Sequence, residues 1–323
     1  MPNGNIITEN LNKDGIDRRG FLKCMAWAGT GAFCILQGGV LKSFALGDSA
    51  LRGMNKMKGE IAFVQISDSH IGFNKAANPD VVGTLREAIA KINALPAAPA
   101  FVLHTGDLSQ LSKPEQFDTL EQALKEIHTD KIFYVPGEHD VLDDNGAGYR
   151  ERFAKGTMGD GWYSFDTGGA HFIGLVNVMN LKAGGLGNLG SEQLAWLEKD
   201  VRYLKSSVPI VVFAHIPLWS IYPEWGWGTS DSEQALSLLK RFGSVTVLNG
   251  HIHQTMRKVE GNVTFHTAMS TAFPQGAPGV TPAPGPMKVP AEKLRSVLGV
   301  TDVNFIRGSH TLGITDSTLG AAM

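Results

Sequence analysis

The sequence predicts an α/β fold whose central sheet is mainly parallel, and two observations support this. Apolar runs with the length of β-strands alternate with helical patterns along the chain. Several of these runs end directly at a Gly, Asp or His residue, and ligand-binding loops of α/β sheets leave the carboxyl ends of strands. The 323 residues, 43% of them hydrophobic, are enough for one large core. We find no second-domain boundary after residue 60, so residues 60–323 are expected to form one domain.

The expected strands are short apolar runs bounded by polar or Gly-containing segments. The first run, residues 60–67, ends at Asp68, and the second, residues 100–104, ends just before Gly106-Asp107. Further strands are expected at residues 131–135, 171–178, 209–214, 244–248, 262–268 and 310–315. Residues 274–290 are rich in Pro and Gly and are expected to form a surface loop.

Helices are expected between these strands. Pro79 fits the first turn of a helix that reaches about residue 95, because a first turn leaves its amide hydrogens unused. The apolar residues of that helix recur at helical spacing, at Val82, Leu85, Ile89 and Ile92. Pro114 opens a second helix, Ser191 is the expected N-cap of a third, and a fourth covers about residues 231–241.

The N-terminus has the pattern of an export signal. Residues 18–23, Arg-Arg-Gly-Phe-Leu-Lys, resemble the twin-arginine consensus, and a Gly/Ala-rich apolar stretch follows from Cys24. Ser43 and Ala45 offer the small residues that a signal peptidase reads. We therefore expect a signal peptide at residues 1–45, a linker at 46–59, and export of the folded protein to the periplasm by the twin-arginine translocase. The alternative is an ordinary N-terminal helix with arginines at its polar end.

Composition excludes several classes of partner and architecture. The formal net charge of −2 provides no broad basic surface for duplex nucleic acid. The chain has two cysteines, Cys24 and Cys34, so the part beyond residue 45 can form no disulfide framework. The sequence has no uninterrupted apolar run of about 18 residues, so we expect no stable membrane span after cleavage.

Short motifs bearing Asp, Glu and His follow the expected strands. They are Asp68-Ser69-His70, Gly106-Asp107, Gly137-Glu138-His139-Asp140, His215 and Gly250-His251-Ile252-His253. Each alone has a structural explanation, because a lone His is commonly buried and Asp after a strand is a common turn residue. The ordered set supplies the oxygen and imidazole ligands that two adjacent metal ions need, and two such ions can clamp both oxygens of a phosphoryl displacement.

This pattern resembles the calcineurin-like metallophosphoesterase superfamily. The runs at residues 106–110 and 250–254 are similar to its class III cyclic-nucleotide phosphodiesterases. The resemblance covers about residues 60–272 and implies a four-layer sandwich of two mixed β-sheets flanked by helices, with the metal site at the carboxyl ends of the strands. The residues alone do not distinguish that sandwich from a single doubly wound sheet.

The resemblance also implies roles for the motif residues. The first metal ion is bound by Asp68, His70 and His253, the second by His215 and His251, and Asp107 bridges both. A hydroxide between the metals is the expected nucleophile. His139 is expected to face the leaving-group oxygen as a proton donor or charge stabiliser, and Asp140 is expected to orient its ring.

Glu138 departs from the family, which has Asn at this position. A Glu carboxylate bound to the second metal would add a negative charge and favour a trivalent ion such as Fe³⁺. We therefore expect two metal ions, iron in one site and iron, manganese or zinc in the other. The alternative is that Glu138 turns away and water fills its place.

The expected function is hydrolysis of a small-molecule phosphoester, with phosphodiesters favoured over monoesters. Two alternatives stay open: an exported di-iron protein for redox chemistry or metal handling, and an inactive member of the family. The aromatic residues of segment 219–227, which follows His215, either stack on a substrate or pack the loop onto the fold.

Overall fold

The computed structural model describes residues 32–37, 40–45, 60–129, 131–179, 181, 185–306 and 312–321. Arg18, Arg19, Cys24 and the expected linker at 46–59 lie outside the described residues. Residues 1–58 and 59–323 are two separate compact units. In the first, β1 (Ala32–Gln37) and β2 (Val40–Ala45) pair in antiparallel fashion. No described helix has the length and hydropathy to cross a membrane.

The second unit contains two mixed β-sheets, as the resemblance implies, and not a single mainly parallel sheet. The five-stranded sheet has the order β13-β12-β3-β4-β5 and the six-stranded sheet the order β10-β11-β9-β8-β7-β6. The strands of the first sheet are β3 (Glu60–Ile66), β4 (Val102–His104), β5 (Ile132–Tyr134), β12 (Gly299–Ile306) and β13 (Gly313–Thr318). The strands of the second are β6 (Tyr163–Thr167), β7 (Ala170–Gly174), β8 (Ile210–Phe213), β9 (Val245–Asn249), β10 (Met256–Glu260) and β11 (Val263–Thr267).

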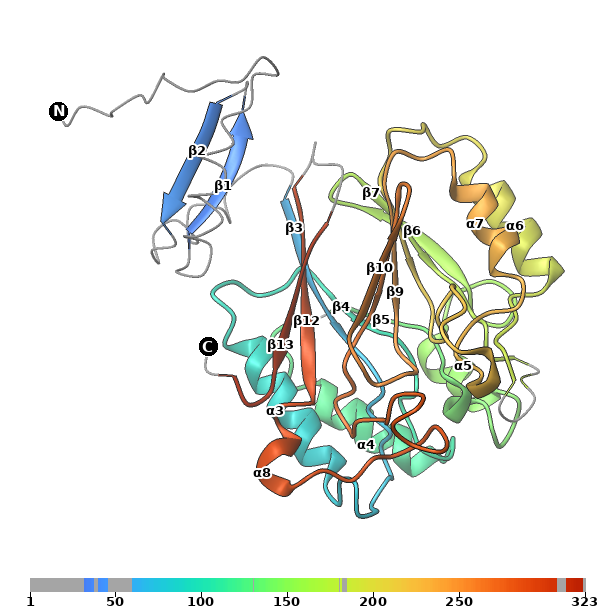
Figure 1. The fold of residues 1–323 in the computed structure, drawn as a ribbon. Helices are drawn as coiled ribbons and strands as arrows, with labels where there is room; N and C mark the ends of the chain where they lie inside the picture. The colour runs from blue at the N-terminus through green and yellow to red at the C-terminus, as the bar shows by residue number, and fades with distance from the viewer. Residues whose placement is uncertain are drawn as a thin grey trace. The chain divides into compact units, whose positions relative to one another are not determined.

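Helices cover the outer face of each sheet, which completes the four layers (Figure 1). Helices α3 and α4 pack on the five-stranded sheet, and α6 and α7 pack on the six-stranded sheet. The α-helices are α3 (Val81–Asn93), α4 (Pro114–Leu124), α5 (Ala147–Phe153), α6 (Ser191–Val201), α7 (Ser232–Leu239) and α8 (Ala291–Leu294). The helix expected after Ser191 begins at that residue, and Gly190 is its N-cap.

The two sheets enclose an aromatic core because side chains along a strand alternate between its faces. On β3, Phe63 points to the space between the sheets, whereas Val64 and Ile66 pack under the helices. The rings of Phe63 and Phe172, on facing sheets, meet edge to face with centroids 5.4 Å apart. Both faces of the central strands are therefore buried, so the sequences of these strands are continuous apolar runs.

The expectation of a mainly parallel sheet is corrected at the sheet edges. The pairs β10–β11, β6–β7, β12–β13 and β3–β12 are all antiparallel. Strand β10 is exposed along its whole length and carries Arg257, Lys258 and Glu260, so it has no apolar alternation that a sequence pattern would detect. Charged residues on an edge strand also oppose pairing with another chain.

His171, on β7, is held between two carboxylates at the edge of the six-stranded sheet. Its Nδ1 lies 2.8 Å from Asp166 Oδ1 and its Nε2 2.9 Å from Asp200 Oδ2. Burial disfavours the charged ring, but the hydrogen bonds that the ring donates to Asp200 and Asp166 outweigh this effect and raise the pKa of His171. When it is protonated, His171 therefore ties β6 and α6 to β7.

We expect His171→Gln to destabilise the protein by about 2 kcal/mol in mild acid, because hydrogen bonds to charged groups are lost. The folded-state pKa lies above the unfolded value of about 6.5. This contribution is therefore complete below that value and disappears as pH rises through the folded pKa. Urea unfolding at several pH values would measure it, with exposed His128→Gln as control. A stability difference that grew with pH would contradict this assignment.

Candidate metal centre

The five motifs lie in the loops that follow five strands. Asp68 comes two residues after β3, Asp107 three after β4, and Glu138 four after β5. His215 and His251 each come two residues after their strands, β8 and β9. Because β3, β4 and β5 are parallel neighbours, as are β8 and β9, their carboxyl ends share an edge within each sheet. The loops from both sheets converge at one buried place.

One group of ligand atoms comes from Asp68, His70, Asp107 and His253, all of them buried. One donor atom of each lies within 4.8 Å of every other. His253 Nε2 is 3.1 Å from His70 Nε2 and 3.3 Å from Asp68 Oδ1. Burial lowers the pKa of His70 to about 3, so its imidazole is neutral, as a metal ligand must be.

A second group consists of Glu138, His215 and His251. Glu138 Oε2 is 2.9 Å from His215 Nε2, and Glu138 Oε1 is 2.9 Å from His251 Nδ1. Neither ring atom nor Glu138 Oε2 makes a hydrogen bond among the described residues, although all three atoms are buried. Buried polar atoms that converge without bonding one another are costly unless a further group satisfies them. A cation is the group that fits this donor set.

Asp107 connects the two groups. Its Oδ2 lies 3.4 Å from His70 Nε2 in the first group and 3.3 Å from His215 Nε2 in the second. One donor atom of Asp107 also lies within 4.8 Å of donor atoms of Glu138 and His139. A carboxylate placed between two donor sets is the arrangement that a bridging ligand requires. The residues present therefore fit two cations that share Asp107.

The backbone at these residues is strained, which is typical of functional sites. Seven described non-glycine residues have positive φ, and five belong to the two groups: Asp68, His70, Asp107, His251 and His253. Gly106 and Gly137 allow the loops to approach closely, because a Cβ on Gly106 would lie 2.8 Å from Gly137 N and one on Gly137 would overlap Asp107. A larger residue at Gly137 would push Asp107 from its place, and one at Gly106 would meet the ring of His215.

The rings of the histidines are oriented by their second nitrogen atoms. His215 Nδ1 donates to Thr105 O over 2.7 Å, and His70 Nδ1 bonds Gln110 Oε1 over 3.0 Å. Each ring therefore presents Nε2 to the centre, and such partners increase the basicity of a ligand.

The electrostatics of the site follow from this mixture of buried acids and imidazoles. Burial opposes ionisation of Glu138, yet His251 and His215 hold the pKa of its carboxyl well below the usual range. Burial likewise opposes the charge on His215, but Asp107 and Glu138 raise its pKa well above normal. Without a cation the acids thus favour the protonated ring of His215, and a bound cation would take the place of that proton.

His139 and Asp140 lie beside the centre, and here the expected role of Asp140 is corrected. His139 Nδ1 donates to Gln110 O over 2.8 Å, so Gln110 orients the ring. The Asp140 carboxylate instead accepts hydrogen bonds from the backbone of Leu108, Ser109 and Gly137. Burial and Asp107 raise the pKa of Asp140 to about 6. Asp140 therefore joins the loops after β4 and β5 and does not hold the ring.

Two supporting residues were given no role in the sequence analysis. Gln110 contacts both His70 and His139, and His104 Nε2 bonds the hydroxyl of Ser69, which lies between two proposed ligands. Burial lowers the pKa of His104 to about 4, so the ring stays neutral. The position of Gln110, three residues after Asp107 of the Gly-Asp motif, was the available signal, but spacing alone does not show which side chains reach back to the site.

The aromatic residues after His215 lie in two different environments. Trp219 packs on Phe265, with ring centroids 5.0 Å apart. Trp225 and Trp227 line a cavity of about 510 Å³ that also touches His139.

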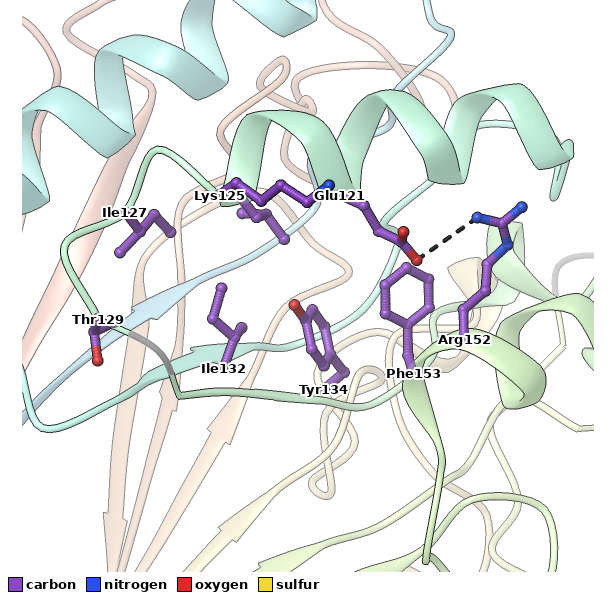
Figure 2. Close-up of a pocket in the computed structure, with 9 residues that line it drawn as sticks. Glu121, Lys125, Ile127, Thr129, Ile132, Tyr134, Arg152 and Phe153 are labelled. Carbon is purple, nitrogen blue, oxygen red and sulfur yellow. Dashed lines mark ion pairs between the residues drawn. The ribbon is translucent and has the colours of Figure 1, made fainter.

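A second hollow, of about 520 Å³, lies between α4, β5 and α5 and contains none of the motif residues. Figure 2 shows its ion pair, in which Arg152 lies 3.6 Å from Glu121.

Comparisons with known proteins agree with this geometry. A 3′,5′-cyclic-nucleotide phosphodiesterase of Nostoc sp. is 26% identical over 219 residues, which cover 66% of this chain and 79% of that protein. The serine/threonine-protein phosphatase CPPED1 of Mus musculus is 29% identical over 221 residues, covering 61% of this chain and 70% of that protein.

A dimetal phosphatase from Danio rerio has the same fold, with a TM-score of 0.58 at 15% identity, over 80% of this chain and 96% of that one. The sequence profile described as calcineurin-like phosphoesterase matches residues 61–255, more than half of the chain. The chain therefore belongs to the calcineurin-like phosphoesterase family.

Proposed function

We propose that this protein hydrolyses phosphodiesters at a dinuclear metal centre in the periplasm. The observation that carries the proposal is the position of Asp107, whose carboxylate lies between two buried donor groups. The proposed ligands are Asp68, His70 and His253 for one ion and Glu138, His215 and His251 for the other, with Asp107 shared. Metal-dependent phosphoesterase chemistry is common to the relatives, whereas the choice of phosphodiesters is our proposal.

The side chains beside the centre would complete the reaction. When bound, two cations would supply Lewis-acid stabilisation of the phosphoryl group and lower the pKa of water. His139 would protonate the leaving oxygen. Because its Nδ1 donates to the Gln110 carbonyl, Nε2 is the ring atom left for substrate. Asp140 would fix the loops that position Asp107 and His139.

The carboxylate of Glu138 supports iron in the second site. Glu138 faces His215 and His251 at 2.9 Å, a contact that supports ligation by Glu138 over the alternative in which it turns away. An anionic oxygen ligand favours a trivalent ion, so we propose iron in one site and iron, manganese or zinc in the other.

An assay of metal-loaded protein against phosphomonoesters, phosphodiesters and cyclic nucleotides would test the proposed function. We expect turnover that chelators remove and metal restores, with phosphodiesters preferred. Metal analysis of the same preparation distinguishes the alternatives. Two bound iron ions without any turnover would favour a redox or metal-handling protein, and failure to retain metal would favour an inactive family member.

Export is a separate prediction, supported by Arg18, Arg19 and the small residues at Ser43 and Ala45. Replacing both arginines with Lys should leave an uncleaved precursor in the cytoplasm, because the translocase reads the arginine pair. Cell fractionation with immunoblotting would measure this, and replacement of Lys13 with Arg is the matched control. Recovery of the cleaved double variant from the periplasm would refute the assignment.

A further inference from the structure

We propose that the cavity beside His139 selects phosphoesters whose leaving group is an uncharged aromatic alcohol, an inference that rests on the proposed phosphoesterase function. The cavity, of about 510 Å³, is bounded on one side by Glu138, His139 and His251 of the metal centre. This volume suits a small organic group. Because His139 is the proposed proton donor, whatever fills the cavity is attached to the leaving oxygen.

The opposite walls of the cavity are apolar and come from three separate parts of the chain. Val141 and Leu142 follow η2 (Glu138–Asp140). Val178 and Leu181 follow β7, and Trp225 and Trp227 follow β8. Leu142 at the rim is 57% exposed. Val178 and Trp227 are buried, whereas Leu142 is exposed, so a ligand in the cavity would cover Leu142 and contact the apolar side chains behind it.

Trp225 is held as a rigid wall. Its ring meets Trp227 edge to face, with centroids 5.2 Å apart, and meets Tyr222 in the same way at 5.4 Å. The residue lies in η3 (Pro223–Trp225), where its amide donates to Tyr222 O and the next amide, of Gly226, donates to Pro223 O. A ring fixed in this way loses little conformational freedom when a flat ligand stacks on it. The geometry favours aromatic groups over flexible chains of equal size.

The charge of the cavity favours a neutral leaving group. Among its described lining residues none is Lys or Arg, and its acid is Glu138 of the metal centre. A carboxylate or second phosphate on the leaving group would therefore enter without a counter-charge from these residues. Lys182 lies in the segment 182–184, outside the described residues, so a Lys182→Ala variant tests whether its charge affects the choice of leaving group.

The first test compares methyl benzyl, methyl hexyl and methyl 4-carboxybenzyl phosphates with the metal-loaded protein. The leaving group of each ester is an alkoxide, so the three esters have similar intrinsic reactivity. We expect kcat/KM for the benzyl ester to exceed that for the hexyl ester about tenfold, the scale of one stacked ring. The carboxybenzyl ester should be the poorest. Equal values for benzyl and hexyl esters would overturn the proposal.

Variants of the cavity residues test whether the cavity causes the preference for the benzyl ester. Trp225→Ala should bring the benzyl-to-hexyl ratio close to one, whereas Trp225→Phe should retain most of it. Tyr203→Ala is the matched control, because Tyr203 is 88% exposed and is not part of the cavity lining.

Leu142→Arg should favour the carboxybenzyl ester. Its control is Val259→Arg, at a 65% exposed residue of β10. Lys182→Ala should leave all ratios unchanged; loss of the preference in that variant alone would overturn the proposal.

A binding measurement separates this inference from the proposed function. Calorimetry should show that benzylphosphonate binds the metal-loaded protein more tightly than methylphosphonate, and that Trp225→Ala removes the difference. If no ester is hydrolysed but this difference is present, the proposed function fails and the inference about the cavity stands. If esters are hydrolysed and the two phosphonates bind equally, the inference fails and the proposed function stands.

Discussion

Asp107→Asn is expected to lose both metal ions and nearly all turnover. Asp107 reaches both donor groups most closely, at 3.4 Å from His70 Nε2 and 3.3 Å from His215 Nε2, whereas Asp68 Oδ1 lies 3.9 Å from His215 Nε2. An amide keeps the shape but removes the charge that holds two cations together. We expect a loss of roughly 10⁴-fold in kcat/KM, the scale seen when a member of a cooperating catalytic unit is removed. Metal analysis and phosphodiester kinetics would measure both effects.

His139→Ala is the informative comparison. This variant should retain two metal ions and lose about 10²–10⁴-fold in rate, the range of general acid catalysis, most for substrates with poor leaving groups. Loss of metal from His139→Ala with full retention by Asp107→Asn would contradict the division of roles.

Glu138→Asn is the second large effect we expect, because it restores the residue typical of the family. The Glu138 carboxylate lies against two rings of the second group. Replacing it with an amide removes a negative charge, so the site should attract anionic phosphoesters more strongly and prefer trivalent iron less. A carboxylate ligand should also release metal in acid, since protonation competes with coordination. Metal content across pH and kinetics of both proteins would test this.

Glu138→Gln separates charge from length. Gln keeps the longer side chain and removes the charge, so it should shift metal preference as Asn does, with poorer geometry. If both variants matched the parent in metal content and kinetics, Glu138 would not be a ligand. If both were inactive, the chemistry of this protein would depend on the carboxylate itself.

The central strands were predictable because both of their faces are buried. Strands β3, β8 and β9 appear in the sequence as unbroken apolar runs, and each ends where expected within about two residues. Three strands of the two sheets were missed: β6, β10 and β12. Strand β10 is wholly exposed and charged, and β6 is only half-buried, so neither carries the alternation that marks a strand. Missing them led to the expectation of a mainly parallel sheet.

The site shows the same division between local and spatial information. Asp68, Asp107 and His215 were identifiable because each follows a strand in a fixed motif. The contacts of Asp140 and Gln110 depend on how two loops cross, and Trp225 meets the cavity only through the turn after β8. No spacing in the sequence encodes which side chain reaches back across a loop.

The most direct test of this account is a metal titration of the metal-free protein, followed by phosphodiester hydrolysis at each step. Two donor groups that share Asp107 predict that turnover rises as the second equivalent binds and stops rising at two equivalents per chain. Full activity at one equivalent, or activity that survives complete removal of metal, would contradict the dinuclear centre.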